Sequence, residues 1–472
     1  MRLQTGAFPA EGAFLYPFSL PEQVKDRFPY FIFLYGGCPM ERSELAYQTY
    51  LKILKRELIS AMGCTEPVAL AYCAAVARAT LGSLPDRITV EASGNIIKNV
   101  KSVVVPNTGG QRGIPAAVCI GVLAGDEKAG LQVLSRVTAG DKEHLVSYMA
   151  ETPVEVKPLI SENLLDMIVT VCAGTSSASV RIANEHTNII RIEKDGSVLQ
   201  ENTPRQEAET GGPSDDDLLT VEKIWDFACT CAINDVKELL DRQIAQNTAI
   251  AEEGMRRDYG ANIGKVLLKA GNDVRTRARA FAAAGSDARM NGSELPVVIC
   301  SGSGNQGLTA SLPVIVYAKE LNADNEKLYR ALLISTLITI HLKSGIGRLS
   351  AYCGAVSAGA GAGCGVAYLL GGDENDIAHT IVNSLAIASG IVCDGAKSSC
   401  AAKIATAVET GIFGYEMYRN GQQFYAGDGL VVKDVENSIN NFGRLARIGM
   451  RGTDEEIIRL MTEETPESGL KE

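Results

Sequence analysis

The stretch Cys353-Gly-Ala-Val-Ser-Ala-Gly-Ala-Gly-Ala-Gly-Cys-Gly-Val-Ala-Tyr-Leu-Leu370 contains no charged side chain. A membrane-spanning helix needs about 20 mainly apolar residues, but Gly, Ala and Ser gain little on transfer into lipid, and no aromatic belts flank this stretch. Small side chains do let backbones approach closely. Across the whole chain 47 of 472 residues are Gly and only 6% are aromatic. We therefore expect a helix buried among other helices, and no membrane span.

Hydrophobic spacing elsewhere predicts the order of helices and strands. Apolar residues recur at helical spacing from Glu41 to Ala61, and a second helix is expected from near Glu66 to about Leu81. Five runs have the composition of strands: Arg87–Ala92, Lys101–Val105, Met167–Cys172, Ala178–Ala183 and Asn188–Glu193. A helix is expected to begin near Ile114, and Asp195-Gly196 predicts a hairpin turn.

The same pattern predicts the domain organisation. Residues 201–217 are rich in Pro, Gly and acidic side chains and are interpreted as a linker, and residues 218–447 have almost wholly helical spacing. The predicted fold class is α+β: a mainly helical catalytic domain of residues 40–86 and 208–472, with an α/β module and its linker inserted at 87–207. Residues 1–39 are expected to be a loose extension or to precede the true start.

Charge and cysteine content exclude several classes of function. The chain has 45 Lys and Arg against 56 Asp and Glu, a net charge of −11, and no basic run offsets it. Phosphate neutralisation needs clustered Lys and Arg, so we expect no nucleic-acid partner. The 12 cysteines lack the dense spacing of a small secreted scaffold, and no targeting segment is recognisable, which favours reduced thiols in a cytoplasmic protein. We expect a small-molecule substrate. The sequence leaves open whether the chain forms a homo-oligomer.

Cys64 is the first candidate for chemistry. It stands in Gly63-Cys64-Thr65-Glu66-Pro67, directly before an apolar helix. Thr65 is the expected N-cap, and Pro67 suits the first turn. The helix dipole and unpaired N–H groups at such a position favour a thiolate, so Cys64 is a candidate base, nucleophile or metal ligand. The alternative is a small buried residue without a chemical role.

Three cysteines further along the chain form a second candidate set. Cys393 and Cys400 enclose the loop-forming Asp394-Gly395, and Cys353 lies well before them at the start of the uncharged stretch. Three thiolates with a long gap and no nearby fourth are incomplete for structural zinc but suit an iron–sulfur cluster with one open iron. Inert cysteines in an Ala/Gly-rich core are the alternative, and Cys364 competes for a ligand role.

Two glycine-rich loops are candidate anion pockets. They are Cys300-Ser301-Gly302-Ser303-Gly304-Asn305-Gln306-Gly307 and Asn107-Thr108-Gly109-Gly110-Gln111-Arg112-Gly113. Each joins a short apolar run to a predicted helix, and backbone N–H groups in such turns suit a carboxylate or phosphate. An ordinary turn is the alternative for each loop.

Four sequence elements together carry a family resemblance. They are Gly63-Cys64-Thr65-Glu66-Pro67, Ser301-Gly-Ser-Gly-Asn305-Gln306-Gly307, Lys343-Ser-Gly-Ile-Gly-Arg-Leu-Ser-Ala-Tyr-Cys353-Gly and Cys393-Asp-Gly-Ala-Lys397-Ser-Ser-Cys400. From about Met40 to Arg447 the chain resembles the L-cysteine desulfidase family, relatives of the iron–sulfur-dependent bacterial L-serine dehydratases. The resemblance implies that Cys353, Cys393 and Cys400 hold a 4Fe-4S cluster and that Cys64 is catalytic.

The resemblance also implies a reaction. It implies α,β-elimination of L-cysteine to pyruvate, ammonia and hydrogen sulfide, with Cys64 as the candidate base for the α-proton. L-serine dehydration by the same mechanism is the alternative. The substrate carboxylate needs cations or N–H donors, and the candidates are Asn107, Ser301, Asn305, Gln306 and Lys397.

Two other functions remain open from the sequence. The Ser301–Gly307 loop also resembles the carboxylate loop of pyridoxal-phosphate eliminases, but Lys265 and Lys269 lack the expected Ser/Asn-Lys setting. The downstream Gly359–Gly365 run is interrupted and apolar, unlike a phosphate loop. A non-catalytic cluster-bearing sensor is the second alternative, although no DNA-binding element or partner-binding helix is apparent.

Overall fold

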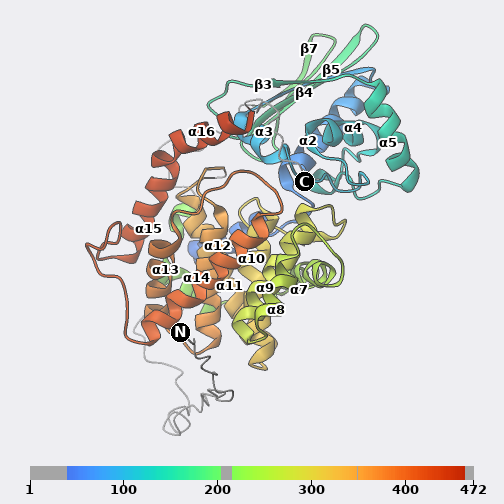
Figure 1. Ribbon diagram of the computed structural model, residues 1–472. Coiled ribbons are helices and arrows are strands. Elements are labelled where there is room, and N and C mark those ends of the chain that lie inside the picture. The colour runs from blue at the N-terminus through green and yellow to red at the C-terminus, as the bar shows by residue number, and fades with distance from the viewer. Residues whose placement is uncertain (1–39, 203–214, 348, 463–472) are drawn as a thin grey trace, which may run out of the picture. The chain divides into compact units, whose positions relative to one another are not determined.

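Helices make up most of the computed structural model, which describes residues 40–202, 215–347 and 349–462 (Figure 1). The α-helices are α1 (Leu45–Glu57), α2 (Thr65–Leu81), α3 (Gly94–Val100), α4 (Gly113–Ala124), α5 (Ala139–Glu151), α6 (Val221–Thr230), α7 (Ile233–Arg256), α8 (Ile263–Ala270), α9 (Val274–Met290), α10 (Gly304–Glu320), α11 (Asn325–Ser344), α12 (Gly354–Leu369), α13 (Glu374–Ala388), α14 (Cys400–Arg419), α15 (Val435–Arg444) and α16 (Arg451–Thr462). The strands are β1 (Ser60–Met62), β2 (Arg87–Ala92), β3 (Val154–Pro158), β4 (Asp166–Ala173), β5 (Ser176–Ala183), β6 (Ile189–Lys194), β7 (Ser197–Glu201) and β8 (Pro296–Val298). Short helical turns are η2 (Gly130–Gln132), η3 (Asp215–Leu218) and the π-helical η4 (Leu445–Gly449). One large sheet in a mainly helical chain confirms the predicted α+β class.

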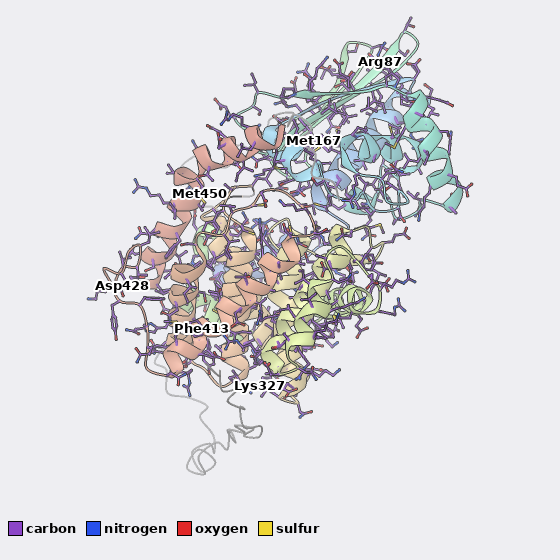
Figure 2. The ribbon with its side chains drawn as sticks, in the orientation of Figure 1. Arg87, Met167, Lys327, Phe413, Asp428 and Met450 are labelled. Carbon is purple, nitrogen blue, oxygen red and sulfur yellow. The ribbon has the colours of Figure 1, made fainter. Side chains whose placement is uncertain are left out.

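The large sheet has six strands in the order β3-β2-β4-β5-β6-β7, with β2 and β3 parallel and the other pairs antiparallel. Alternate β4 residues, among them Met167 (Figure 2) and Val169, are fully buried, and α2 packs against this strand and β5. Burial of every second residue is the pattern of a strand that buries one face of its sheet. Figure 1 shows α2, α4 and α5 on one side of this sheet. The Asp195-Gly196 turn joins β6 to β7 with positive φ at both residues, which confirms the predicted hairpin.

The uncharged stretch forms α12, and its small residues explain how it packs. It contacts α10, α11, α13 and α14. A Cβ added at Gly411 of α14 would lie 1.9 Å from the carbonyl oxygen of Gly359, and one at Gly363 would lie 2.3 Å from the carbonyl oxygen of Gly411. Both distances are far below contact, so only glycine allows these backbones to approach so closely. Among the described residues, no helix combines the length and the apolar character that crossing a membrane would need.

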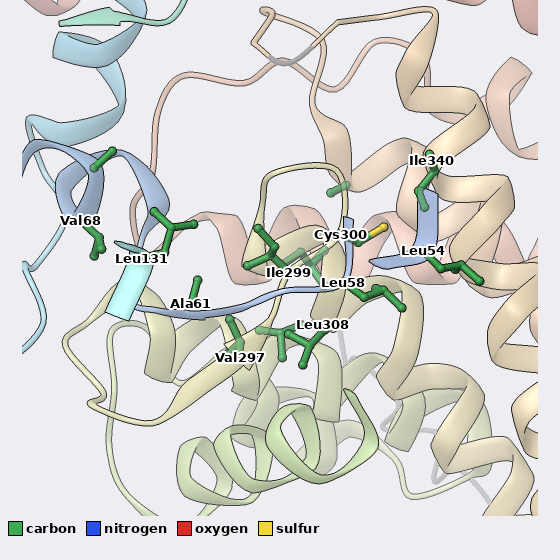
Figure 3. Close-up of a cluster of buried hydrophobic side chains, with 14 of the residues drawn as sticks. Leu54, Leu58, Ala61, Val68, Leu131, Val297, Ile299, Cys300, Leu308 and Ile340 are labelled. Atoms are coloured by element: carbon green, nitrogen blue, oxygen red, sulfur yellow. The ribbon is translucent and has the colours of Figure 1, made fainter. Parts of the chain in front are cut away.

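A second, two-stranded sheet was not predicted from the sequence. The helix predicted from Glu41 to Ala61 is shorter, because α1 ends at Glu57 and the chain then pairs β1 antiparallel with β8. Figure 3 shows Ala61 and Val297 of these strands within a cluster of buried apolar side chains that also contains Leu58 and Leu308. The strands therefore tie the segment after α1 to the segment before α10.

Another prediction is wrong. Residues 101–105 form no strand, and only Val104 makes an isolated bridge, to Arg112. Pro106 follows at once and lacks an N–H, and Asn107 takes a positive φ of 58°, so the chain turns before a ladder can extend. The apolar run is buried all the same, with Val103 and Val105 both fully inaccessible.

The predicted domain boundaries stay predictions. Residues from Met40 onward form one compact unit, in which α2 packs against the sheet although it precedes the predicted module. The predicted extension, residues 1–39, lies outside the described residues, as does most of the predicted linker.

Candidate active site

A cavity of about 110 Å³ brings together residues from widely separated parts of the chain. Cys64 and Glu66 of the α2 N-terminus, Lys98 of α3, and His186 of the turn between β5 and β6 contribute to its lining. Residues from the second half complete the lining, and those that matter below are Arg289, Ser301, Asn305, Gln306, Lys343, Tyr352, Cys353, Cys393 and Cys400.

The lining has unmet hydrogen-bonding capacity. In the part of the chain that the structure describes, 18 buried side-chain nitrogen and oxygen atoms have no hydrogen-bond partner, and six of them belong to lining residues. These six are Asn95 Oδ1, His186 Nε2, Arg289 Nε, Arg289 Nη2, Gln306 Oε1 and Tyr352 Oη. Buried polar atoms normally find partners, so their concentration around one cavity makes it suited to a polar ligand or to water.

The structure brings Cys353, Cys393 and Cys400 together in this cavity. The Cys353 amide donates to the Ile391 carbonyl at 3.0 Å and the Cys393 amide to the Ala351 carbonyl at 2.6 Å, so two segments distant in the sequence run side by side. Burial, followed by the charges of the other two cysteines, raises the pKa of the Cys353 thiol to about 12. Burial also raises the pKa of Cys400. The thiolate forms of Cys353 and Cys400 are therefore disfavoured unless a positive group joins them.

The three cysteines supply thiol donors of the kind that bind metal groups. Within the described ranges, no group of three or more His, Cys, Asp or Glu has the arrangement to hold one ion. Ligands of a single ion converge on one atom at about 2.3 Å, whereas the thiolates of a cluster bind different irons and lie further apart. A bound cationic metal group would also favour the thiolate form of all three cysteines.

Cys364 does not belong to the set. It lies in α12, fully buried, and its Sγ is 3.8 Å from the carbonyl oxygen of Ile377. Burial raises the pKa of Cys364, as expected for an inert cysteine in an apolar core. It is absent from the cavity lining.

Cys64 faces the same cavity, but its environment is the reverse of the expected one. It is the N-cap of α2 in place of Thr65, without a side-chain cap bond, and its Sγ–H donates to Glu66 Oε2 at 3.1 Å. Burial, followed by the Glu66 charge, raises the pKa of Cys64 well above its ordinary value, and the nearby Arg289 charge opposes this only in part. The helix dipole therefore does not give Cys64 the low pKa that the sequence suggested, because burial and the Glu66 charge raise it.

Glu66 is the centre of a buried polar network. Its carboxylate accepts from Asn99 Nδ2 at 3.1 Å, lies 3.0 Å from the Thr65 hydroxyl and lies 4.0 Å from His186 Nε2. Burial alone would raise the pKa of Glu66, but the nearby His186 and the Cys64 hydrogen bond lower it to about 2. Glu66 is thus a carboxylate at neutral pH and a fixed acceptor for Cys64.

Three buried cations line the cavity, and they differ in how they are paired. Lys98 is 2% exposed and forms an ion pair with Asp454 of α16. Lys343 is 5% exposed and donates to the Gly347 carbonyl. Arg289 is 2% exposed and donates through Nη1 to the neutral Asn305 Oδ1 at 3.1 Å.

The predicted carboxylate-binding residues divide into two groups. Ser301, Asn305 and Gln306 line the cavity, and Ser301 takes a positive φ of 49°, which is uncommon for a residue with a side chain. Asn107 and Lys397 do not line it. Asn107 is buried and donates to the Leu134 carbonyl at 2.7 Å, and Lys397 pairs with Asp394 at 2.6 Å.

Comparison with known proteins identifies the family. Residues 128–459 match the family model described as serine dehydratase alpha chain. The chain belongs to this family. A UPF0597 protein of Desulfitobacterium hafniense (strain Y51) is 57% identical over 423 residues, which are 89% of this chain and 98% of the relative. UPF0597 proteins of Lachnoclostridium phytofermentans and Finegoldia magna are 51% and 45% identical, each over 88% of this chain and over 99% and 100% of the relatives. Membership places the chain among lyase-type enzymes.

Several lining residues of this serine dehydratase-like chain escaped sequence reasoning. Glu66 stands inside the Gly-Cys-Thr-Glu-Pro motif, and its position close after Cys64 was the one available signal. His186 and Arg289 carried none, because a single histidine in a turn and an arginine at a helix end have no ligand spacing. Only the fold brings them within reach of Cys64.

Proposed function

We propose that this chain is an L-cysteine desulfidase, a carbon–sulfur lyase that converts L-cysteine to pyruvate, ammonia and hydrogen sulfide with a 4Fe-4S cluster held by Cys353, Cys393 and Cys400. The observation that carries the proposal is that the three cysteines and Cys64 line one cavity. Membership of the serine dehydratase alpha chain family supports the elimination chemistry.

The cluster and the protein would divide the work. A 4Fe-4S cluster with three protein thiolates supplies a Lewis-acidic iron toward the β-thiol of cysteine or the β-hydroxyl of serine. Most of the residues that line the cavity are buried, and low exposure to solvent strengthens the electrostatic interactions between them. Lys403 supports the ligand loop, since it pairs with Asp394 and donates to the Val392 carbonyl at 2.9 Å.

Cys64 is the proposed proton-transfer group. Its Sγ holds a proton against Glu66 Oε2 in the structure, so it must lose that proton before it can take the α-proton of the substrate. Glu66 fixes the direction of the S–H bond and keeps the proton on sulfur, because its charge disfavours the thiolate. Activity should therefore rise with pH as Cys64 ionises.

L-serine is the second candidate substrate, and the family description favours it. Soft sulfur binds iron more tightly than a hydroxyl oxygen does, which favours cysteine. The described residues of the cavity would contact the same groups of either substrate, because L-cysteine and L-serine differ only at the β-substituent.

The proposal is tested by anaerobic assays of purified protein with L-cysteine and L-serine as paired substrates. We expect pyruvate and sulfide from L-cysteine, with iron and acid-labile sulfide near four each per chain. Turnover that persists after iron removal, or stoichiometric pyridoxal phosphate, would overturn the cluster assignment. Cys64→Ala is the matched variant, and we expect it to retain iron and sulfide but lose turnover.

A further inference from the structure

Arg289 is a buried charge without a counter-charge. It ends α9 at the penultimate position, is 2% exposed, and forms no ion pair among the described residues. Its one hydrogen bond goes to the neutral Asn305 Oδ1, and its Nε and Nη2 have no partner. Burying an unpaired guanidinium is costly, so such a group is expected to have a function that offsets the cost.

A second and independent feature adjoins the guanidinium. Helix α10 begins at Gly304 after Ser303, whose side chain makes no cap bond. The first N–H groups of a helix have no partner within it and carry partial positive charge. A Cβ at Gly304 would lie 2.3 Å from Arg289 Nε, so the glycine lets the guanidinium rest against this first turn.

Both features belong to the cavity that Cys64 lines. Arg289 is near enough for its charge to lower the pKa of the Cys64 thiol against the larger effect of burial. The other two buried cations are less suited, since Lys98 is matched by Asp454 and Lys343 has hydrogen-bond partners of its own.

We infer that Arg289, with the first turn of α10, binds the α-carboxylate of the amino-acid substrate. This inference rests on the proposed function, in which the substrate is an α-amino acid. A planar guanidinium offers two parallel donors to a carboxylate, and Asn305 fixes its orientation by accepting a hydrogen bond from Nη1. A substrate anchored there presents its α-carbon and β-substituent to a cavity lined by Cys64 and the three cysteines.

The experiment compares two unreactive fragments of cysteine. 3-Mercaptopropionate keeps the thiol and the carboxylate, and cysteamine keeps the thiol and the amine. Their dissociation constants are measured by anaerobic calorimetry on wild type, Arg289→Gln and Arg289→Lys. We expect Arg289→Gln to weaken 3-mercaptopropionate by about 10- to 150-fold and cysteamine by less than about twofold. Arg289→Lys should fall between, because a point charge replaces the fork.

Two variants guard against a folding artefact. Gly304→Ala keeps every charge but pushes a Cβ against the guanidinium, and we expect it to weaken 3-mercaptopropionate selectively. Arg279→Gln removes an arginine of the same helix that pairs with Glu409 and does not line the cavity, and it should alter neither fragment.

The outcomes separate this inference from the proposed function. Equal weakening of both fragments, or none, in Arg289→Gln overturns the carboxylate site, whatever the wild type does with L-cysteine. Selective weakening in a protein that does not turn over L-cysteine supports the site and overturns the proposed substrate. Selective weakening in an active desulfidase supports both.

Discussion

Replacing Glu66 with Gln tests whether Cys64 is the base. The substitution keeps the shape of the side chain and an oxygen able to accept the Cys64 hydrogen bond, but it removes the negative charge 3.1 Å from the sulfur. That charge is the second cause, after burial, of the raised pKa of Cys64. Its loss therefore lowers the pKa of Cys64, while burial continues to raise it.

The size of the effect follows from the distance. Two unit charges 3.1 Å apart repel by about 5 kcal/mol at an effective dielectric constant of about 20. One pH unit corresponds to about 1.4 kcal/mol, so the midpoint of Cys64 ionisation would fall by at most roughly four pH units. Solvent and neighbouring dipoles respond to the change, so we expect a displacement of roughly one to four pH units.

The assay is the pH dependence of kcat/KM for L-cysteine. If Cys64 is the base, kcat/KM rises with pH as Cys64 ionises, and Glu66→Gln moves this rise to lower pH. Ionisation of L-cysteine itself is common to both enzymes and cancels in the comparison. Thr65→Val is the matched control, because it removes a hydroxyl 3.0 Å from Glu66 Oε2 and leaves the charge in place. An unmoved rise in an active Glu66→Gln enzyme would refute the assignment of Cys64 as base.

Two further predictions concern the cofactor and the packing. Each single replacement by Ser of a predicted cluster ligand should yield protein without bound iron and labile sulfide. The three predicted ligands are Cys353, Cys393 and Cys400. Cys364→Ser should retain both by iron and sulfide analysis, and equal loss in all four would show that the ligand set is misassigned. Gly411→Ala should lower the free energy of unfolding by about 2 kcal/mol or more in urea titrations, because its Cβ would meet the Gly359 carbonyl at 1.9 Å. Gly452→Ala, where a Cβ meets nothing within 4 Å, should instead gain up to about 1 kcal/mol, and a loss there would contradict the packing explanation.

Local pattern predicted most elements, since their signals lie within a few residues. The strand predicted at Arg87–Ala92 has those bounds in β2, and the helix predicted to Leu81 ends there in α2. The two-stranded sheet was missed because β1 is very short and pairs with the equally short β8, which lies far along the sequence after α9. The strand predicted at 101–105 failed for another reason, since its apolar run is buried but pairs only through the isolated bridge of Val104 to Arg112.

Several residues that the sequence singled out by their side-chain chemistry gather in one cavity. The four cysteines and the loop of Ser301, Asn305 and Gln306 all line the cavity. The protonation state of Cys64 was not predictable, because a helix N-terminus argues for a thiolate whereas burial beside Glu66 argues for a thiol. The dipole effect is worth about 1 kcal/mol at most surface sites, so burial and a charge at contact distance outweigh it.

The two proposed roles of the cavity, cluster binding and proton transfer at Cys64, depend on residues from different parts of the chain, so single substitutions can test them separately. The proposed ligand cysteines lie on two segments that pair through Tyr352 and Val392. The groups that hold the Cys64 proton come instead from α2, α3 and the turn carrying His186. Among the described residues, Glu66 makes no hydrogen bond to the two segments that carry Cys353, Cys393 and Cys400, although Ala396 and Cys400 pack against the buried cluster that contains Cys64. Variants at Glu66 should keep their iron but lose activity or show a shifted pH dependence of kcat/KM. Variants at Cys353 should lose iron while the hydrogen bond from Cys64 to Glu66 persists.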